Sequence, residues 1–184
     1  MTKAAARMLR LMDRAGTAWR FPIIGKDKAR LLERLIVRHK PRHALEVGSL
    51  FGYSAIALAG SLPPGGRLTC IEESPFLAWI VAQNVEAAGL KRRVRVVEGD
   101  ALRALPLLRG PVDFALIDAR KEDYLDYLRA VEPRLVNGAV VVADNTGIFR
   151  RELKDYLAHV RAAPWESREH DFGDDCMEVS IFHG

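Results

Sequence analysis

From residue 42 onward, short runs of β-branched and apolar residues alternate with stretches in which apolar residues recur at helical spacing. Runs of the first kind predict five strands, over residues 43–47, 67–71, 94–97, 112–117 and 139–143. Residues 114–117 are continuously apolar, as a strand that is covered on both faces requires. The alternation predicts repeated βα units and therefore a mostly parallel sheet with helices on both faces.

The stretches between the strands predict amphipathic helices. One of them begins at Ser74 and Pro75, which are typical of a helix start, and ends at Gly89. Its predicted buried face consists of Phe76, Ile80, Ala87 and Ala88. A later helix has an apolar face formed by Leu153, Tyr156, Leu157 and Val160. Ahead of the first strand, the spacing of Leu31, Leu32, Leu35 and Ile36 predicts a helix that ends before Pro41, and residues 2–14 predict another.

The end of the chain predicts two further strands, over residues 165–172 and 176–182, joined by a turn at 173–175. This pair is expected to be antiparallel. The predicted fold is therefore α/β, with a seven-stranded, mostly parallel sheet whose last strand is antiparallel.

The chain has 184 residues, of which 49% are hydrophobic, enough for one domain that buries roughly 70% of its unfolded surface. We expect a single domain over residues 1–184, with a basic helical extension at 1–40 and an α/β core at 41–184. Cys70 and Cys176 are too few for a disulfide framework, and without a signal peptide the prediction is a cytoplasmic protein. No apolar run approaches the ~20 residues of a membrane span.

Positive charge is concentrated at the start of the chain. Residues 1–42 carry 12 Lys and Arg against three acidic residues, a net charge of +9, whereas the rest of the chain carries −5. Three interpretations compete: a solvated helical face, a surface for an anionic substrate or nucleic acid, and an Arg-rich transit peptide. The transit peptide is the weakest, because the segment runs without a break into the domain.

Ligands of an open α/β sheet bind beyond the carboxyl ends of its strands, so the residues there are the candidates for a site. The first strand runs into a turn, Glu46 to Ser54, in which Gly48 and Gly52 would let the backbone approach a ligand. It is not the dinucleotide fingerprint, since Leu50 stands in the place of the second glycine. Residues at the next two strand ends are Glu72, suited to ribose hydroxyls, and Gly99, Asp100 and Ala101. Together they favour a nucleoside ligand, although singly they could be solubilising groups.

The fourth and fifth strands end in Asp118 and in Asp144-Asn145. If these strands are neighbours, two carboxylates and an amide oxygen converge, and this donor set suits Mg²⁺, with Mn²⁺ or Ca²⁺ as alternatives. The competing interpretation, equally weighted, is that the aspartates cap helices or pair with Arg120 or Arg150. Lys121 could be a general base near such a metal, or a solvated lysine.

These motifs, in this order, resemble the metal-dependent class I O-methyltransferases that use S-adenosylmethionine (SAM), in particular the catechol and caffeoyl-CoA group. The resemblance runs from Ile24-Gly25 to Met177-Glu178-Val179 and rests on five strand-end motifs. The family's first motif is matched by Glu46-Val47-Gly48 with Gly52-Tyr53-Ser54, and residues 155–160 resemble the helix after its fifth strand. The resemblance implies a Rossmann-like methyltransferase fold.

The resemblance also implies roles for individual residues. Gly48 and its neighbours, including Ser49, would pass the methionine part of SAM, with Ser54 and the Ile24 backbone at its carboxylate and amine. Glu72 would hold the ribose, and Asp100 and Ala101 would border the adenine. The implied metal ligands are Asp118, Asp144 and Asn145, and the implied catalytic lysine is Lys121. The group also implies a homodimer for its caffeoyl-CoA-like members.

Two features depart from the family pattern. The chain is short beyond Val160, with no counterpart of the acidic residue that grips the second hydroxyl of a catechol. Ala119 and Arg120 replace the larger rings expected beside the metal, although Trp19 and Phe21 lie in the region of an aromatic gate. These departures leave the reaction class standing and the acceptor open.

Three functions follow as hypotheses. The first is a magnesium-dependent O-methyltransferase acting on vicinal hydroxyls of a small acceptor. The second keeps SAM and methylates RNA or another anionic substrate bound by the basic segment. The third is a non-catalytic nucleoside-binding or assembly protein, since a fold does not fix a function.

Overall fold

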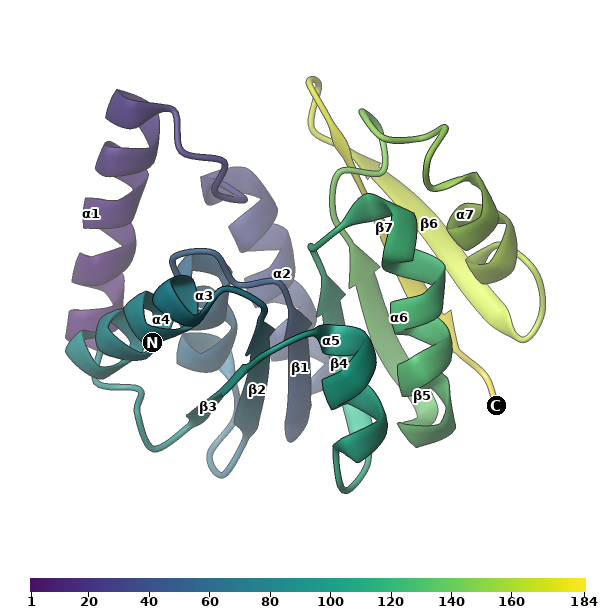
Figure 1. Cartoon of the computed structure of the whole chain (residues 1–184), viewed down its shortest axis with the longest axis horizontal. Coiled ribbons are helices and arrows are strands. Elements are labelled where there is room, and N and C mark those ends of the chain that lie inside the picture. Colours follow the sequence, from purple (N-terminus) through teal and green to yellow (C-terminus); the bar gives the residue numbers. More distant parts are fainter.

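The computed structural model describes all residues, 1–184, and contains a seven-stranded sheet flanked by helices (Figure 1). The strands are β1 His43–Val47, β2 Arg67–Glu72, β3 Val94–Glu98, β4 Val112–Ile117, β5 Leu135–Ala143, β6 Trp165–Asp171 and β7 Cys176–Phe182. The helices are α1 Lys3–Trp19, α2 Lys26–His39, α3 Tyr53–Ser61, α4 Pro75–Ala87, α5 Ala101–Ala104, α6 Tyr124–Val131 and α7 Lys154–Val160. None of them is long and apolar enough to cross a membrane.

The strands lie in the order β3-β2-β1-β4-β5-β7-β6. Strands β1 to β5 are parallel, β7 is antiparallel to β5, and β6 is antiparallel to β7. The strand order reverses between β1 and β4, so the carboxyl ends of these two strands form the topological switch point of the sheet. The predicted fold class is confirmed.

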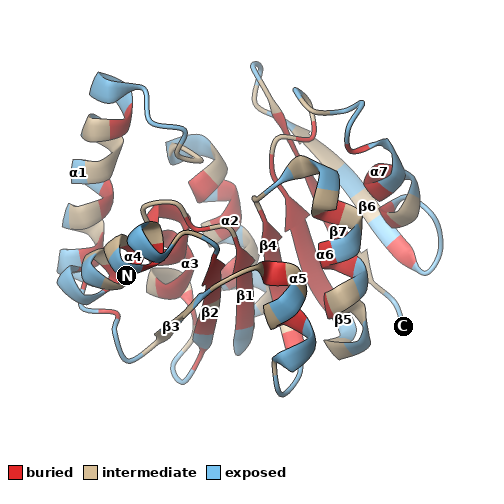
Figure 2. Ribbon diagram, in the orientation of Figure 1, coloured by how far each residue is buried: buried red, intermediate tan, exposed pale blue.

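Successive strand residues point to opposite faces of the sheet and build two cores. In β4, Phe114 and Leu116 pack with α1, α2, α3 and α4, whereas Ala115 and Ile117 pack with α5, α6 and α7. The carboxyl-terminal halves of β1, β4 and β5 are buried, whereas exposed residues lie on the outer surfaces of the helices, in loops, at the amino ends of strands and on the edge strands β3 and β6 (Figure 2). Both faces of the sheet are therefore covered, and its carboxyl edge is left for a ligand.

Three sequence predictions need correction. The buried face of α4 consists of Ala78, Val81 and Val85, whereas Phe76 is 66% exposed and stacks on Trp79, which is also exposed, with ring centroids 6.4 Å apart. Of the predicted face of Phe76, Ile80, Ala87 and Ala88, only Ala88 is buried, whereas Ile80 is half-buried and the other two are exposed. Strand β5 begins at Leu135, earlier than predicted, and α1 extends to Trp19. The predicted face of α7, in contrast, is fully buried.

Candidate active site

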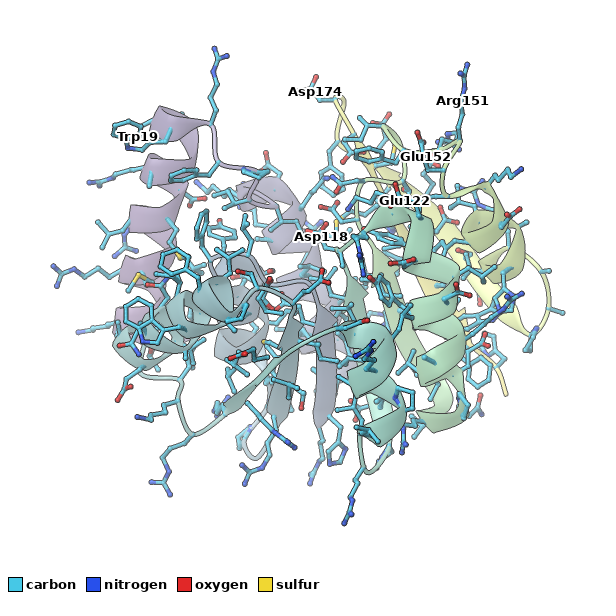
Figure 3. The ribbon with its side chains drawn as sticks, viewed as in Figure 1. Trp19, Asp118, Glu122, Arg151, Glu152 and Asp174 are labelled. Carbon is cyan, nitrogen blue, oxygen red and sulfur yellow. The ribbon has the colours of Figure 1, made fainter.

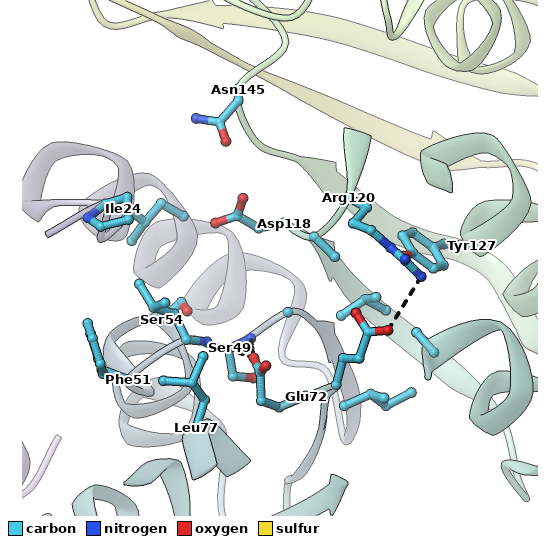
Figure 4. Close-up of a pocket in the computed structure, with 18 of the residues that line it drawn as sticks. Ile24, Ser49, Phe51, Ser54, Glu72, Leu77, Asp118, Arg120, Tyr127 and Asn145 are labelled. Atoms are coloured by element: carbon cyan, nitrogen blue, oxygen red, sulfur yellow. Dashed lines mark hydrogen bonds and ion pairs between the residues drawn. The ribbon is translucent and has the colours of Figure 1, made fainter. Parts of the chain in front are cut away.

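A cleft of about 440 Å³ opens beyond the carboxyl ends of β1, β2 and β4, at the switch point of the sheet (Figure 4). Most of the residues proposed from the sequence line it: Ile24, Gly48, Ser49, Ser54, Glu72, Ala101, Asp118, Lys121 and Asn145. The other four, Glu46, Gly52, Asp100 and Asp144, lie next to lining residues without lining the cleft themselves. The strand-end residues of five different elements thus meet at one site.

The turn after β1 is packed tightly against the end of β4. Gly48 has φ +84°, and a Cβ at this position would overlap the carbonyl oxygen of Asp118, so only glycine fits. The Asp118 N–H in turn donates to Val47 O at 2.9 Å. Gly52 has φ +84° as well and begins α3, whose first turn carries Ser54. This backbone contact brings the α3 N-terminus and Asp118 to the same cleft.

Glu72 secures the same turn from β2. One carboxylate oxygen, Oε2, accepts hydrogen bonds from the Ser49 and Leu50 N–H groups, both at 3.0 Å, and Oε1 accepts one from Ser74 N at 3.1 Å. The side chain is 8% exposed and lines the cleft. Glu72 therefore orients the turn while it presents a carboxylate to the cleft.

Glu46 lies behind the turn and is fully buried. Its Oε2 accepts a hydrogen bond from Ser49 Oγ at 2.6 Å, and its Oε1 has no partner. Burial raises the pKa of this carboxyl to about 7, and the nearby charge of Asp118 acts in the same direction. The residue supports the turn through Ser49.

The third strand end is arranged around the short helix α5. Asp100 accepts a hydrogen bond from Leu102 N at 2.8 Å and so caps this helix. Gly99 and Ala101, on either side of it, line the cleft. Asp100 thus fixes the wall that its two neighbours form.

Asp118 and Lys121 form the opposite wall. Lys121 Nζ lies 3.0 Å from Asp118 Oδ1 and donates to Tyr124 Oη at 2.7 Å, and the Tyr124 hydroxyl donates to the Asp144 carbonyl oxygen at 3.2 Å. The ammonium group also lies 5.7 Å from the centroid of the Phe149 ring. Lys121 is therefore held over the end of β4 rather than extended into solvent.

Asp144 and Asn145 follow β5. Asp144 is 2% exposed, and Lys28 Nζ of α2 lies 2.5 Å from its Oδ1. Burial and the charge of Asp118 raise the pKa of Asp144 to about 6, and Lys28 opposes that shift. Asn145 has φ +61°, and Figure 4 shows its amide oxygen directed toward Asp118. Asp144 thus already binds a cation, the ammonium of Lys28, and Asp118 lies close enough for its charge to act on Asp144.

Lys28 and Asp175 belong to this cluster but were not among the sequence candidates. Asp175, in the turn just before β7, accepts from Lys28 Nζ at 2.6 Å and from Asn145 Nδ2 at 2.7 Å. Its other oxygen accepts from Gly147 N and Ile148 N, at 3.2 and 3.1 Å. The antiparallel pairing of β7 with β5 brings Asp175 beside Asn145, and knowledge of that pairing would have identified it.

Asp118 and Asp144 do form ion pairs, as the competing interpretation expected, but their partners are not Arg120 or Arg150. Arg120 pairs with Glu73 at 3.6 Å and Asp123 at 3.1 Å, and Arg150 pairs with Glu169. The partners of Asp118 and Asp144 are the two lysines, Lys121 and Lys28.

The aromatic rim of the cleft also differs from the expectation. Trp19 is 74% exposed and points away from Asp118 (Figure 3). Phe21 contacts Phe51, with ring centroids 5.1 Å apart, and it is Phe51 and Phe149 that line the cleft. Arg120 and Tyr127 form the rim on the opposite side (Figure 4).

The comparisons with solved structures define the class of protein. An O-methyltransferase from Bacillus cereus, in complex with SAH, has a TM-score of 0.84 at 25% identity, over 96% of this chain and 90% of that one. An O-methyltransferase from Streptomyces achromogenes, in complex with SAM, has a TM-score of 0.85 at 25% identity, over 100% of this chain and 91% of that one. The fold is therefore the Rossmann-like fold of methyltransferases.

The sequence comparisons define the family. A family model described as O-methyltransferase matches residues 7–154. The catechol O-methyltransferase of Sus scrofa is 36% identical over 145 residues, which are 75% of this chain and 77% of the relative. That of Mycobacterium tuberculosis is 42% identical over 105 residues, 56% of this chain and 48% of the relative. The chain belongs to the O-methyltransferase family, as its strand-end motifs indicated. It spans about half to three quarters of the length of the curated relatives it matches.

Proposed function

We propose that the protein transfers a methyl group from SAM to a hydroxyl of a small catechol-type acceptor, with the help of a divalent cation. The observation that carries this proposal is the single cleft in which the glycine turn of β1 faces Asp118, Lys121 and Asn145. Relatives named catechol O-methyltransferase and neighbours solved with SAM or SAH support it.

SAM would lie along the turn that Gly48 and Gly52 shape. Its methionine carboxylate and amine would meet Ser54, the Ile24 backbone and the N-terminus of α3, because free helix N–H groups favour an anion. Glu72 would accept a hydrogen bond from the ribose hydroxyls through Oε1, which accepts only the Ser74 N–H and so has a further lone pair. The adenine would lie against the wall beside Ala101.

The residues present fit a divalent cation. Asp118, Asp144 and Asn145 would hold it through oxygen atoms, which Mg²⁺ prefers. Asn145 is a necessary ligand in this set, because no group of three acidic, histidine or cysteine side chains is placed to bind a metal. The ammonium of Lys28, 2.5 Å from Asp144, shows that this cluster attracts positive charge. When bound, the cation would lower the pKa of an acceptor hydroxyl and neutralise its charge.

Lys121 is the proposed general base. Once the Lys121 ammonium has released a proton to solvent, Nζ would take the proton of the acceptor hydroxyl, and the resulting oxyanion would attack the methyl carbon of SAM. The new O–CH₃ bond forms as the S–CH₃ bond breaks, and the products are a methyl ether and SAH. The walls of the cleft hold the two reactants in line, which supplies much of the rate.

Asp144→Ala tests the proposal. It should abolish metal-dependent methyl transfer, because a proposed metal ligand is lost. SAM binding, measured by calorimetry, should stay close to that of the wild type, because Asp144 does not line the cleft in which SAM would lie. Asp155→Ala, which removes an exposed carboxylate from α7, is the matched control and should leave both unchanged. Full activity of Asp144→Ala would contradict the assigned metal site.

A further inference from the structure

Lys28 has no part in the mechanism above, yet its side chain is built into the site. It comes from the first turn of α2 and reaches the end of β5 and the start of β7. The ammonium lies 2.5 Å from Asp144 and 2.6 Å from Asp175, and the side chain is only 11% exposed. A lysine this buried and doubly paired is a fixed part of the cleft wall and not a solvated surface charge.

The charges around it are nearly balanced. Three carboxylates, of Asp118, Asp144 and Asp175, face two ammonium groups, of Lys28 and Lys121, which leaves a formal charge of −1. Each of the two carboxylates that would bind the metal is therefore already paired with a lysine. A divalent cation that enters must displace or repel the ammonium of Lys28, which is already bound to Asp144.

Asp175 offers the displaced ammonium a second position. Its carboxylate is fixed by two backbone N–H groups and by Asn145 Nδ2, so it stays in place when Lys28 moves. The same hydrogen bond from Nδ2 directs the amide oxygen of Asn145 away from Asp175. Asp175 thus serves both as the anchor of Lys28 and as the orienting partner of a proposed metal ligand.

We infer that Lys28 is the internal counter-ion of the metal ligands. Its ammonium holds Asp144 and, through Asp175, Asn145 in their binding positions while no metal is bound, and it competes with the divalent cation for Asp144. Lys28 is thus a positioning residue that lowers the affinity for the metal and stabilises the metal-free protein. The inference rests on the proposed function in one respect, the assignment of Asp144 and Asn145 as metal ligands.

Mn²⁺ binding to the whole protein, measured by calorimetry and by electron paramagnetic resonance at constant pH, tests the inference. Lys28→Met keeps the length of the side chain and removes its charge, so the cluster becomes more negative and Mn²⁺ should bind at least about tenfold more tightly. Lys26→Met makes the same charge change at an exposed position of the same helix, and should leave the affinity unchanged.

The metal-free proteins give a second readout. In EDTA, Lys28→Met should melt at a lower temperature than the wild type, because Asp144 is left buried without a counter-ion, and saturating Mn²⁺ should abolish that difference. If Lys28→Met does not fold, Lys28→Gln, which keeps a hydrogen-bond donor, takes its place.

The outcomes separate the inference from the proposed function. If Asp144→Asn abolishes Mn²⁺ binding and Lys28→Met binds it no more tightly than the wild type, the metal site stands and the competition by Lys28 is refuted. If Asp144→Asn binds Mn²⁺ as the wild type does, or if no variant binds it, the assigned metal ligands and the inference fall together.

Discussion

Glu46→Gln is the substitution whose effect can be worked out most fully. Glu46 is completely buried beneath the turn that follows β1. Its pKa is raised from 4.5 to about 7, and one of its oxygens has no hydrogen-bond partner. Glutamine has nearly the same shape and can still accept the hydrogen bond from Ser49 Oγ, but it carries no charge. The variant therefore removes the penalty of ionising a carboxyl inside the protein.

The magnitude follows from proton linkage. Above pH 4.5 the unfolded chain loses the Glu46 proton, while the folded protein keeps it up to about pH 7. The folded state therefore binds more protons, and the contribution of Glu46 to stability falls as the pH rises between these values and is constant above them. At about 1.4 kcal/mol for each pH unit, the loss amounts to about 3 kcal/mol. Glu46→Gln should lack this loss.

Urea unfolding of both proteins at a series of pH values, in EDTA, measures the effect. The free energy of unfolding of the variant minus that of the wild type should increase by about 3 kcal/mol between about pH 4.5 and pH 8. Glu152→Gln, at an exposed position without an ion pair (Figure 3), is the control and should give a flat difference. A difference for Glu46→Gln that does not change with pH would refute the argument that Glu46 is protonated in the folded protein.

Three further predictions concern the site and the fold. Gly48→Ala should destabilise the protein by about 1–3 kcal/mol and weaken SAM binding, because a Cβ at φ +84° overlaps the Asp118 carbonyl; wild-type SAM affinity would contradict this. Lys121→Met should lower kcat at least about 100-fold without changing the Kd for SAM, and a rate within a few-fold of the wild type would exclude it as the base. Phe76→Ser should change the free energy of unfolding by less than about 0.5 kcal/mol, whereas Leu58→Ala should lower it by about 2–5 kcal/mol. Equal losses for the two variants would show that Phe76 is buried in the core.

The sheet was predictable because its strands carry a strong local signal. The apolar run at residues 114–117 and the regular alternation of elements need no tertiary information. The α4 helix shows where this signal fails, since residues 76–82 are all apolar and their spacing does not single out a face. The neighbours of α4 decide which side is buried, and they select the small residues Ala78 and Val81 over the bulkier Phe76.

The site residues that stand directly at strand ends were predictable from the sequence, whereas those placed by packing were not. The rule that ligands bind at strand ends placed Asp118 and Asn145 in the cleft, because it depends only on the end of a strand and the direction of the sheet. Lys28 comes from a helix ahead of the sheet and Asp175 from the turn before an antiparallel strand, and their positions depend on packing that local patterns do not encode. For the same reason, the sequence offered Arg120 and Arg150 as partners of the aspartates, whereas the structure places lysines there.

The most direct test of the central claim is the transfer of a labelled methyl group from SAM to a panel of catechols, including caffeoyl-CoA, first with Mg²⁺ and then with EDTA. Label should appear in at least one acceptor with Mg²⁺ and disappear with EDTA. If SAM binds and no label reaches any acceptor in either condition, or if EDTA leaves the transfer unchanged, the proposed metal-dependent O-methylation in this cleft is contradicted.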